Sequence, residues 1–213
     1  LLPSVDGYEN YVAHVSQFVK SEKAKGLYYN HVKNIVTRTN TVTGKPYTED
    51  PAIFSWQIGN EPRAFARDSV TKAAFAEWMC SSASLIKSLD PNHMVSTGSE
   101  GLYGCEVDME LCEQIHADEN IDYLTIHIWP VNWGWAPRSN PDSGIESACI
   151  ESGNYIAEHI ELAKKLNKPL VIEEFGYSRK DNVSGTEPTT ESRDIFYSFI
   201  FEQVKNSVEQ NLP

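Results

Sequence analysis

The chain has 213 residues and a hydrophobic fraction of 40%, which is enough for one sizeable core and favours a single domain or part of a larger one. Its 30 acidic residues outnumber its 18 basic residues, so the formal net charge is −12. A surface this negative repels nucleic-acid backbones and anionic membranes, and we expect neither as a partner. No run of about 18 apolar residues is present, so we expect no membrane span. The sequence does not open with a signal peptide, although one could have been removed.

Hydrophobic periodicity and turn signals divide the chain into helices and short strands. In chain order we expect helices over 8–19 and 27–40, a strand over 53–59, a helix over 75–86, strands over 94–97 and 121–128, a helix over 155–166, a strand over 170–172 and a helix over 195–204. The first predicted strand runs directly into Asn60, Glu61 and Pro62, which cannot continue a buried strand.

Strands that are continuously apolar and alternate with helices are typical of a parallel sheet covered by helices, so we predict an α/β fold. A (β/α)8 barrel has eight strands and about 250 residues. Only four strands are predicted in this sequence. Two interpretations follow from the count: a small open sheet, or the middle of a barrel with both ends missing.

The four cysteines are Cys80, Cys105, Cys112 and Cys149. No two of them have CxxC spacing, so a zinc site or a thioredoxin-like motif has no support. Cys80 falls in a helical pattern and is expected to be a small core residue. Cys105 and Cys112 flank a short loop and can pair if the protein is exported. The sequence leaves the disulfide pairing open.

Polar residues cluster where each predicted strand ends. They are Asn60 and Glu61, Ser99 and Glu100, His127 and Trp129, and Glu173 and Glu174. Because sites form at the carboxyl ends of parallel strands, we expect these groups to converge. Glycoside hydrolysis needs two opposed carboxylates: one protonates the leaving oxygen, and the other attacks the anomeric carbon or activates a water. Solvated loop charges are the alternative, but they do not explain polar endings on all four strands.

Two segments resemble family 5 glycoside hydrolases. Residues 56–63 (WQIGNEPR) are similar to the acid/base strand of that family, and residues 171–176 (VIEEFG) to its nucleophile strand. The stretch 38–44 (RTNTVTG), with Tyr47 and Asp50 after it, resembles the endo-β-1,4-mannanase branch. The resemblance covers residues 8–204 and implies a (β/α)8 TIM barrel. We expect residues 1–213 to be the middle portion of this catalytic domain, about strands 4 to 7, incomplete at both ends.

The resemblance implies catalytic roles for two glutamates. Glu61 resembles the general acid/base, and Glu174, directly before the Phe-Gly pair, resembles the nucleophile. The adjacent Glu173 should point elsewhere because side chains alternate along a strand. A retaining enzyme holds the two carboxyls about 5 Å apart, with the nucleophile ionised and the acid protonated at the start.

The same resemblance implies substrate-binding roles for further residues. Asn60 resembles the residue that hydrogen-bonds the sugar 2-OH, and Arg63 resembles a mannosyl-binding residue, although a structural ion pair fits Arg63 equally well. His127 resembles a residue lining the cleft, or is a satisfied histidine at a strand end. Glu100 matches an acidic position at the end of the fifth strand. Trp129 stands where the family often has a tyrosine that contacts the nucleophile, so that hydrogen bond is left open and a stacking role is suggested.

Three tryptophans, Trp129, Trp133 and Trp135, lie close together after His127. Exposed aromatic rings offer flat apolar faces for sugar rings. The alternative is that the three rings pack against one another beneath the loop. We expect at least one of them to line the cleft and treat all three as candidate substrate-binding residues.

The sequence therefore predicts a retaining enzyme resembling endo-β-1,4-mannanases, which cleaves plant mannans by double displacement. A β-glucan hydrolase of the same family and a non-catalytic sugar-binding protein are the alternatives, and the presence of both carboxylates argues against the latter. No metal or organic cofactor is implied, since HExxH, phosphate-cradling glycine and GxSxG motifs are missing from the sequence. We expect a monomer, secreted or located at the cell surface or in the periplasm, that acts on polysaccharide or oligosaccharide.

Overall fold

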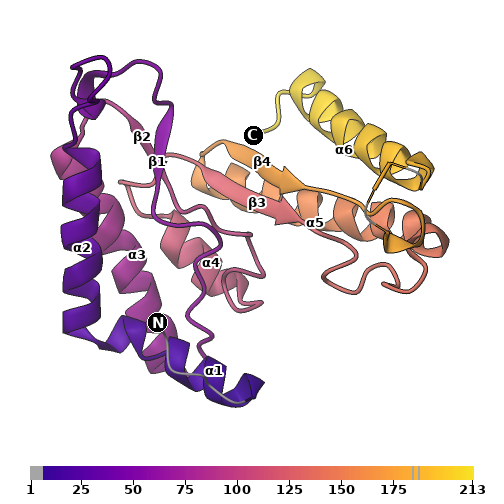
Figure 1. The fold of residues 1–213 in the computed structure, drawn as a ribbon, viewed down its shortest axis with the longest axis horizontal. Helices are drawn as coiled ribbons and strands as arrows, with labels where there is room; N and C mark the ends of the chain where they lie inside the picture. The colour runs from indigo at the N-terminus through magenta and orange to yellow at the C-terminus, as the bar shows by residue number, and fades with distance from the viewer. Residues whose placement is uncertain (1–6, 184, 187) are drawn as a thin grey trace. The chain divides into compact units, whose positions relative to one another are not determined.

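The computed structural model describes residues 7–183, 185–186 and 188–213, which form two compact units, one ending at Leu124 and the other beginning at Thr125 (Figure 1). The first unit contains α1 (Tyr8–Val15), α2 (Glu22–Val36), β1 (Ser55–Gln57), α3 (Ser69–Leu89), β2 (Met94–Ser96) and α4 (Met109–His116). The second contains β3 (Leu124–Ile128) apart from its first residue, α5 (Ile145–Leu166), β4 (Leu170–Phe175) and α6 (Glu191–Glu209). Strands and helices alternate, which confirms the predicted α/β class.

Each predicted strand and helix overlaps an observed one, but two elements differ from expectation. The first predicted helix splits, because α1 ends at Val15 and a separate 3-10 turn covers Phe18–Lys20. Helix α4 was not predicted. Its signals were present in the sequence, since Asp108 caps its first turn by accepting hydrogen bonds from two backbone N–H groups, and its apolar positions at 111, 112 and 115 are buried.

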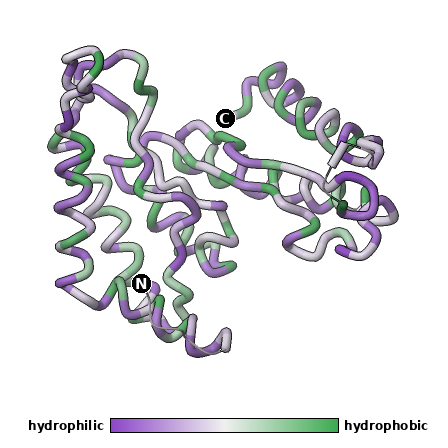
Figure 2. The backbone as a smooth tube through the Cα atoms, viewed as in Figure 1, coloured by the Kyte–Doolittle hydropathy of each residue, from purple (hydrophilic) through white to green (hydrophobic). Residues whose placement is uncertain are grey.

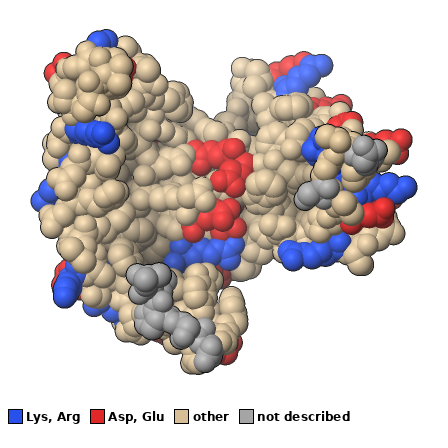
Figure 3. All heavy atoms as spheres, in the orientation of Figure 1, with Lys and Arg blue, Asp and Glu red and all other residues tan. Residues whose placement is uncertain are grey.

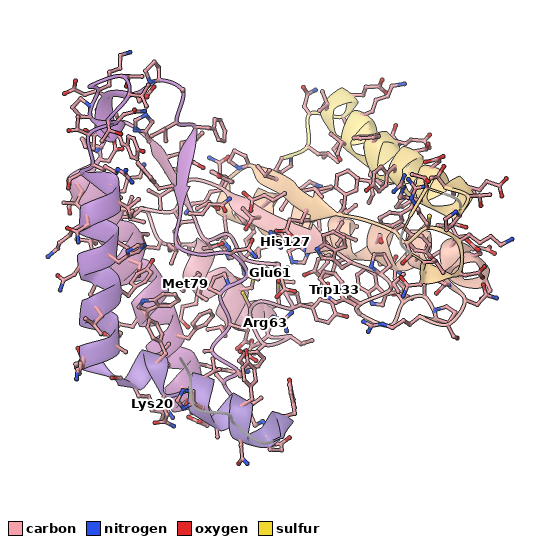
Figure 4. All side chains as sticks on the ribbon, viewed as in Figure 1. Lys20, Glu61, Arg63, Met79, His127 and Trp133 are labelled. Atoms are coloured by element: carbon pink, nitrogen blue, oxygen red, sulfur yellow. The ribbon has the colours of Figure 1, made fainter. Side chains whose placement is uncertain are left out.

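Strands β1 and β2 of the first unit pair in parallel, with Trp56 opposite Val95. The pairing continues along the chain, because Ser96 bridges to Tyr123, the residue just before β3. Helix α3 contributes core side chains such as Phe75 and Met79, which are 1% exposed. Figure 4 labels Met79 on this helix. The parallel arrangement places the residues after β1 and after β2 at the same edge of this sheet.

Asp90, directly after α3, is hydrogen-bonded to the middle residue of β1. The Trp56 indole donates to Asp90 over 2.8 Å, and Asp90 also pairs with His93. Burial disfavours the charge of Asp90, but the hydrogen bonds from Trp56, His93 and the neighbouring backbone outweigh it, so the pKa of Asp90 lies below its usual value. This buried carboxylate connects the end of α3 to β1.

In the second unit, β3 and β4 form a two-stranded sheet and run in the same direction (Figure 1). Every residue of β3 is buried. The prediction of a buried strand at 170–172 was wrong in degree, because all six residues of β4 are only half-buried. Phe175 contacts Tyr197 and Phe201 and so packs β4 against α6.

The surface agrees with the composition of the chain. Hydrophilic and hydrophobic residues alternate along the helices, as surface helices require (Figure 2). On the face shown in Figure 3, Lys and Arg side chains lie in small separate groups among the acidic ones. Among the described residues, no helix combines the length and apolar character that crossing a bilayer demands. All four cysteines are free thiols, with Cys80 on α3 and Cys149 on α5 only half-buried; the expectation of a core position for Cys80 is therefore met only in part.

Candidate active site

The turn after β1 carries Glu61 in a constrained backbone conformation. Glu61 has a φ of 49°, unusual for a residue with a side chain. Its backbone N–H donates to the carbonyl of Gly98 over 2.9 Å. Gly98 itself has a φ of +67°, and a Cβ there would lie 2.0 Å from the carbonyl oxygen of Gly59. The two turns after β1 and β2 are therefore in direct backbone contact, and this contact fixes the backbone position of Glu61.

Arg63 and Glu100 form an ion pair inside the first unit, with the Arg63 Nε donating to a Glu100 carboxylate oxygen. The Glu100 side chain is only 4% exposed, and that of Arg63 is 30% exposed. Burial lowers the pKa of Arg63, but the hydrogen bond and charge of Glu100, assisted by the charge of Glu61, outweigh it, so the net shift is upward. Figure 4 shows Glu61 and Arg63 on the same segment between β1 and α3. The ion-pair interpretation of Arg63 is confirmed, and its substrate-binding role stays a prediction.

The end of β4 carries Glu174, which two aromatic residues from β3 and its following loop surround. The Trp129 indole N–H donates to a Glu174 oxygen over 3.1 Å. The same oxygen lies 3.4 Å from Nδ1 of His127, and that histidine is 1% exposed. The family often has a tyrosine at the position of Trp129, and the sequence left open whether tryptophan could make the same hydrogen bond to Glu174. The structure shows that it does, through the indole N–H.

Glu173 was expected to point away from this group. Alternation does put it on the same face of β4 as Phe175, which packs on α6. Its carboxylate nevertheless lies 3.6 Å from Nε2 of His127. Buried His127 thus stands between the two carboxylates, with one ring nitrogen toward each, so the expectation that Glu173 lies clear of the group is not met.

Gly176 makes room for the Trp129 ring. A Cβ at Gly176 would lie 2.4 Å from that ring, closer than any real side chain tolerates. The Gly176 N–H also donates to the Ile128 carbonyl over 3.2 Å, which ties the end of β4 to the end of β3. The glycine after Phe175 therefore has a definite role: it lets the indole lie against the strand end with its N–H directed at Glu174.

Trp133 and Trp135 pack against each other edge to face, with ring centroids 4.9 Å apart, and both contact Tyr155 of α5. They behave as the alternative interpretation supposed, although both remain half-buried. Trp129 behaves differently, because it lines a surface hollow together with Val131 and Gly176.

The predicted site residues therefore gather in two groups. The first unit holds Asn60, exposed at its turn, with Glu61, Arg63 and Glu100, and the second unit holds His127, Trp129, Glu174 and the two remaining tryptophans. The separation of about 5 Å between the two catalytic carboxyls stays a prediction. Outside this site, the first unit brings together three potential metal ligands, Cys105, Cys112 and His116.

Sequence reasoning did not identify the functions of Gly98 and Gly176. Both lie directly in the segments that follow the strands, and glycine is the signal for a left-handed φ or for a close approach. The sequence does not show which group lies against each of these two glycines. Only the fold places the Gly59 carbonyl against Gly98 and the Trp129 ring against Gly176.

Comparison with known proteins assigns the chain to a family. The model of a family described as GH family 5 beta-mannosidase-like matches residues 2–213. The chain is 34% identical over 208 residues to mannan endo-1,4-beta-mannosidase 1 of Arabidopsis thaliana, and the match covers 90% of this chain and 47% of that protein. Mannan endo-1,4-beta-mannosidase 4 of Solanum lycopersicum is 32% identical over 205 residues. The chain thus spans about half the length of the curated relatives it matches.

Solved structures show the same likeness. A family 5 mannosidase mutant from Rhizomucor miehei, in complex with mannosyl-fructose, is similar with a TM-score of 0.83 at 30% identity, covering 99% of this chain and 51% of that chain. The hyperthermostable endo-1,4-beta-D-mannanase of Thermotoga petrophila is similar with a TM-score of 0.68 at 27% identity, covering 88% of this chain and 53% of the other. The family match spans nearly the whole sequence and includes both glutamate-bearing segments, and the chain belongs to the β-mannosidase-like branch of glycoside hydrolase family 5.

Proposed function

We propose that the protein is a retaining endo-β-1,4-mannanase in which Glu174 is the nucleophile and Glu61 the general acid/base. The observation that carries this proposal is the hydrogen bond from the Trp129 indole to Glu174 at the end of β4. It holds one carboxylate oxygen and leaves the other to react. The names of the relatives, mannan endo-1,4-beta-mannosidases, support the choice of substrate.

In the proposed first step, a Glu174 oxygen attacks the anomeric carbon of a mannosyl unit, and the bond to the leaving oxygen breaks as Glu61 transfers its proton there. The product is a glycosyl ester on Glu174. In the second step, Glu61, now ionised, takes a proton from water, and the resulting hydroxide equivalent displaces Glu174 from the anomeric carbon. Both carboxyls return to their starting protonation states, and the configuration at the anomeric carbon is retained.

The substrate-binding proposals build on the two local groups. Asn60 follows β1 directly and would hydrogen-bond the sugar 2-OH. Glu100 accepts a hydrogen bond from Nε of Arg63, and the Arg63 side chain is 30% exposed. The guanidinium, positioned by this ion pair, would donate hydrogen bonds to a mannosyl unit. Trp129 would place a sugar ring against the hollow that its own ring lines. Trp133 and Trp135 would contribute their exposed edges.

We also propose that the four strands are consecutive strands of a (β/α)8 barrel, at about positions four to seven, and that residues 1–213 are the middle of its catalytic domain. The alternation of strands and helices and the parallel β1–β2 pair support this assignment. A polysaccharide substrate cannot enter a cell intact, so the proposed enzyme would be secreted or held at the cell surface or in the periplasm. We propose that it acts as a monomer.

The substrate proposal is tested with matched polysaccharides. The complete protein should release reducing sugar from β-1,4-mannan, with internal cuts that lower viscosity early, and should do so at least ~10-fold faster than from a β-1,4-glucan, because the two polymers differ at the 2-OH that Asn60 would contact. Activity on the glucan alone would support the β-glucan hydrolase instead. Tight oligosaccharide binding without cleavage would support a sugar-binding protein.

The role of Trp129 is tested by Trp129→Phe, which keeps an aromatic ring and removes the N–H donor. A hydrogen bond to a charged group contributes roughly 1.5–3 kcal/mol, so kcat on mannan should fall about 10- to 100-fold while KM changes little. Trp56→Phe is the matched control, since it removes an indole bond to a carboxylate, Asp90, outside the site. It should lower stability and leave kcat within about twofold. Equal losses of kcat in both variants would show that the Trp129 bond is merely structural.

A further inference from the structure

Two thiols lie together in the interior of the first unit. Cys105 belongs to the loop between β2 and α4 and is 1% exposed, and Cys112 lies on α4 and is fully buried. Their sulfur atoms lie within 4.8 Å of each other and of a ring nitrogen of His116. The Cys112 sulfur is 3.6 Å from Nδ1 of that histidine. The other two cysteines are half-buried on α3 and α5.

The backbone around the two thiols is held firmly. The Cys105 N–H donates to the Gly101 carbonyl over 3.1 Å, and the Cys105 carbonyl accepts from the N–H of Asp108, the residue that caps α4. Gly104 is packed so tightly that a Cβ there would lie 2.2 Å from the Ser99 hydroxyl. The backbone that carries Cys105 is thus held at both its N–H and its carbonyl, next to the first turn of the helix that carries Cys112.

Thiols beside a histidine could hold a metal ion or form a disulfide, and the hydrogen bonds favour the second. Nδ1 of His116 lies 2.8 Å from the Cys112 carbonyl, an acceptor, so this nitrogen carries a proton and donates it. Nε2 lies 3.1 Å from the Thr97 hydroxyl, which can donate to it. Both nitrogens of a neutral imidazole are then engaged. A metal would have to displace one of these bonds, whereas a disulfide leaves them intact.

We propose that Cys105 and Cys112 form an intrachain disulfide when the protein folds in an oxidising environment. The oxidant is a small-molecule disulfide such as oxidised glutathione. One cysteine thiolate attacks it and forms a mixed disulfide, releasing one thiol; the second cysteine then attacks the protein sulfur and releases the other. The two cysteine protons and two electrons end on two molecules of reduced thiol, and one S–S bond joins Cys105 to Cys112.

The bond forms during folding and not in the native state. In the folded protein, the contact with Cys112 and the burial of the site raise the pKa of the Cys105 thiol well above its usual value, so the reactive thiolate is scarce. Once formed, the disulfide is equally shielded from reductants. It would brace a loop in which Glu106 and Val107 both have left-handed φ values, of 60° and 56°, an unfavourable conformation for a β-branched residue.

The tryptic map of this sequence allows a direct test. Cleavage after Lys87 and after Arg138 releases one tryptic peptide, residues 88–138, that contains Cys105 and Cys112 and no other cysteine. Cys80 and Cys149 fall in separate peptides, 73–87 and 139–164. The complete protein is produced with export to an oxidising compartment, and in parallel is refolded with reduced and oxidised glutathione. It is then denatured, alkylated and digested without reductant.

The expected result is a peptide 88–138 that takes no alkyl group and is lighter than its reduced form by two hydrogen atoms, while the other two peptides each take one alkyl group. Native protein prepared reduced and then exposed to oxidised glutathione should keep both thiols for hours, since they are buried. Two alkyl groups on peptide 88–138 from the exported and the refolded protein would overturn the proposal. The proposal would also be overturned if the protein bound one equivalent of zinc and the Cys112→Ser variant bound none.

A stability measurement provides the second readout. Refolding with a reductant in place of glutathione should lower the Tm of the wild-type protein by about 5 °C, because the disulfide closes a short loop in the unfolded chain. In Cys112→Ser, reductant and oxidant should give the same Tm, and Cys105 should now take an alkyl group. Cys80→Ser is the matched control and should keep the full difference. A difference that persists in Cys112→Ser would contradict the proposal.

Discussion

Glu174→Gln should lower kcat on mannan by about 10³-fold or more, because an amide cannot form the glycosyl ester of the first step. Glu173→Gln should lower kcat less than ~10-fold, since the Glu173 carboxylate lies at the other nitrogen of His127 and on the face of β4 that packs against α6. The two variants make the same chemical change at adjacent positions, so each controls for the other.

A covalent label distinguishes the two carboxylates independently of rates. A 2-deoxy-2-fluoro mannosyl fluoride slows the second step more than the first and should leave the sugar attached to the nucleophile. Fragmentation of tryptic peptide 166–179, which holds both residues, should place the sugar on Glu174. A label on Glu173, or a larger loss of kcat in Glu173→Gln, would mean that the assignment of the nucleophile is reversed.

Glu61→Ala should behave differently from both. A substrate with an acidic phenol as leaving group does not need protonation, so the first step should remain fast with such a substrate and glycosyl-enzyme should accumulate. With mannan the same variant should be slow. Equal loss of rate on both substrates would remove Glu61 from the acid/base role.

Gly98→Ala should reduce the free energy of unfolding by about 3 kcal/mol or more. The left-handed φ costs an alanine roughly 1 kcal/mol, and its Cβ would also stand 2.0 Å from the Gly59 carbonyl oxygen, a backbone atom that cannot turn aside. The measurement is the midpoint of urea denaturation, followed by circular dichroism. The same clash displaces the backbone of residue 98, whose carbonyl accepts a hydrogen bond from the Glu61 N–H, so kcat should also fall.

Gly44→Ala is the matched control. Gly44 has a nearly identical φ of +71°, but nothing lies within 4 Å of a Cβ built there. This variant should lose only the conformational cost of about 1 kcal/mol and keep its kcat. The difference between the two variants therefore measures the close approach of the turns after β1 and β2. Equal destabilisation of both would show that the turns separate easily and do not hold Glu61.

Local patterns identified most of the elements, because they depend on short-range signals. Apolar spacing located α3 and α5, although both helices begin earlier than predicted, by six and ten residues. The apolar runs located β2, which ends one residue early, and β3, which begins three residues late. The same kind of signal was overlooked for α4, where Asp108 and the apolar positions of a short helix stood in the sequence. The half-burial of β4 could not be predicted, because burial of a strand depends on its neighbours and not on its own hydropathy.

The sequence by itself determined the family, because the segments 56–63 and 171–176 resemble it and the family match covers residues 2–213; the roles of the residues in those segments stay predictions. Only the tertiary structure decided how those residues are held. It paired Arg63 with Glu100, directed the Trp129 indole at Glu174, and used two glycines to allow backbone and ring contacts. It also brought Cys105 and Cys112 together. Such contacts join segments from different elements. The order of residues shows which chemical groups are available, but only folding decides which of them come into contact.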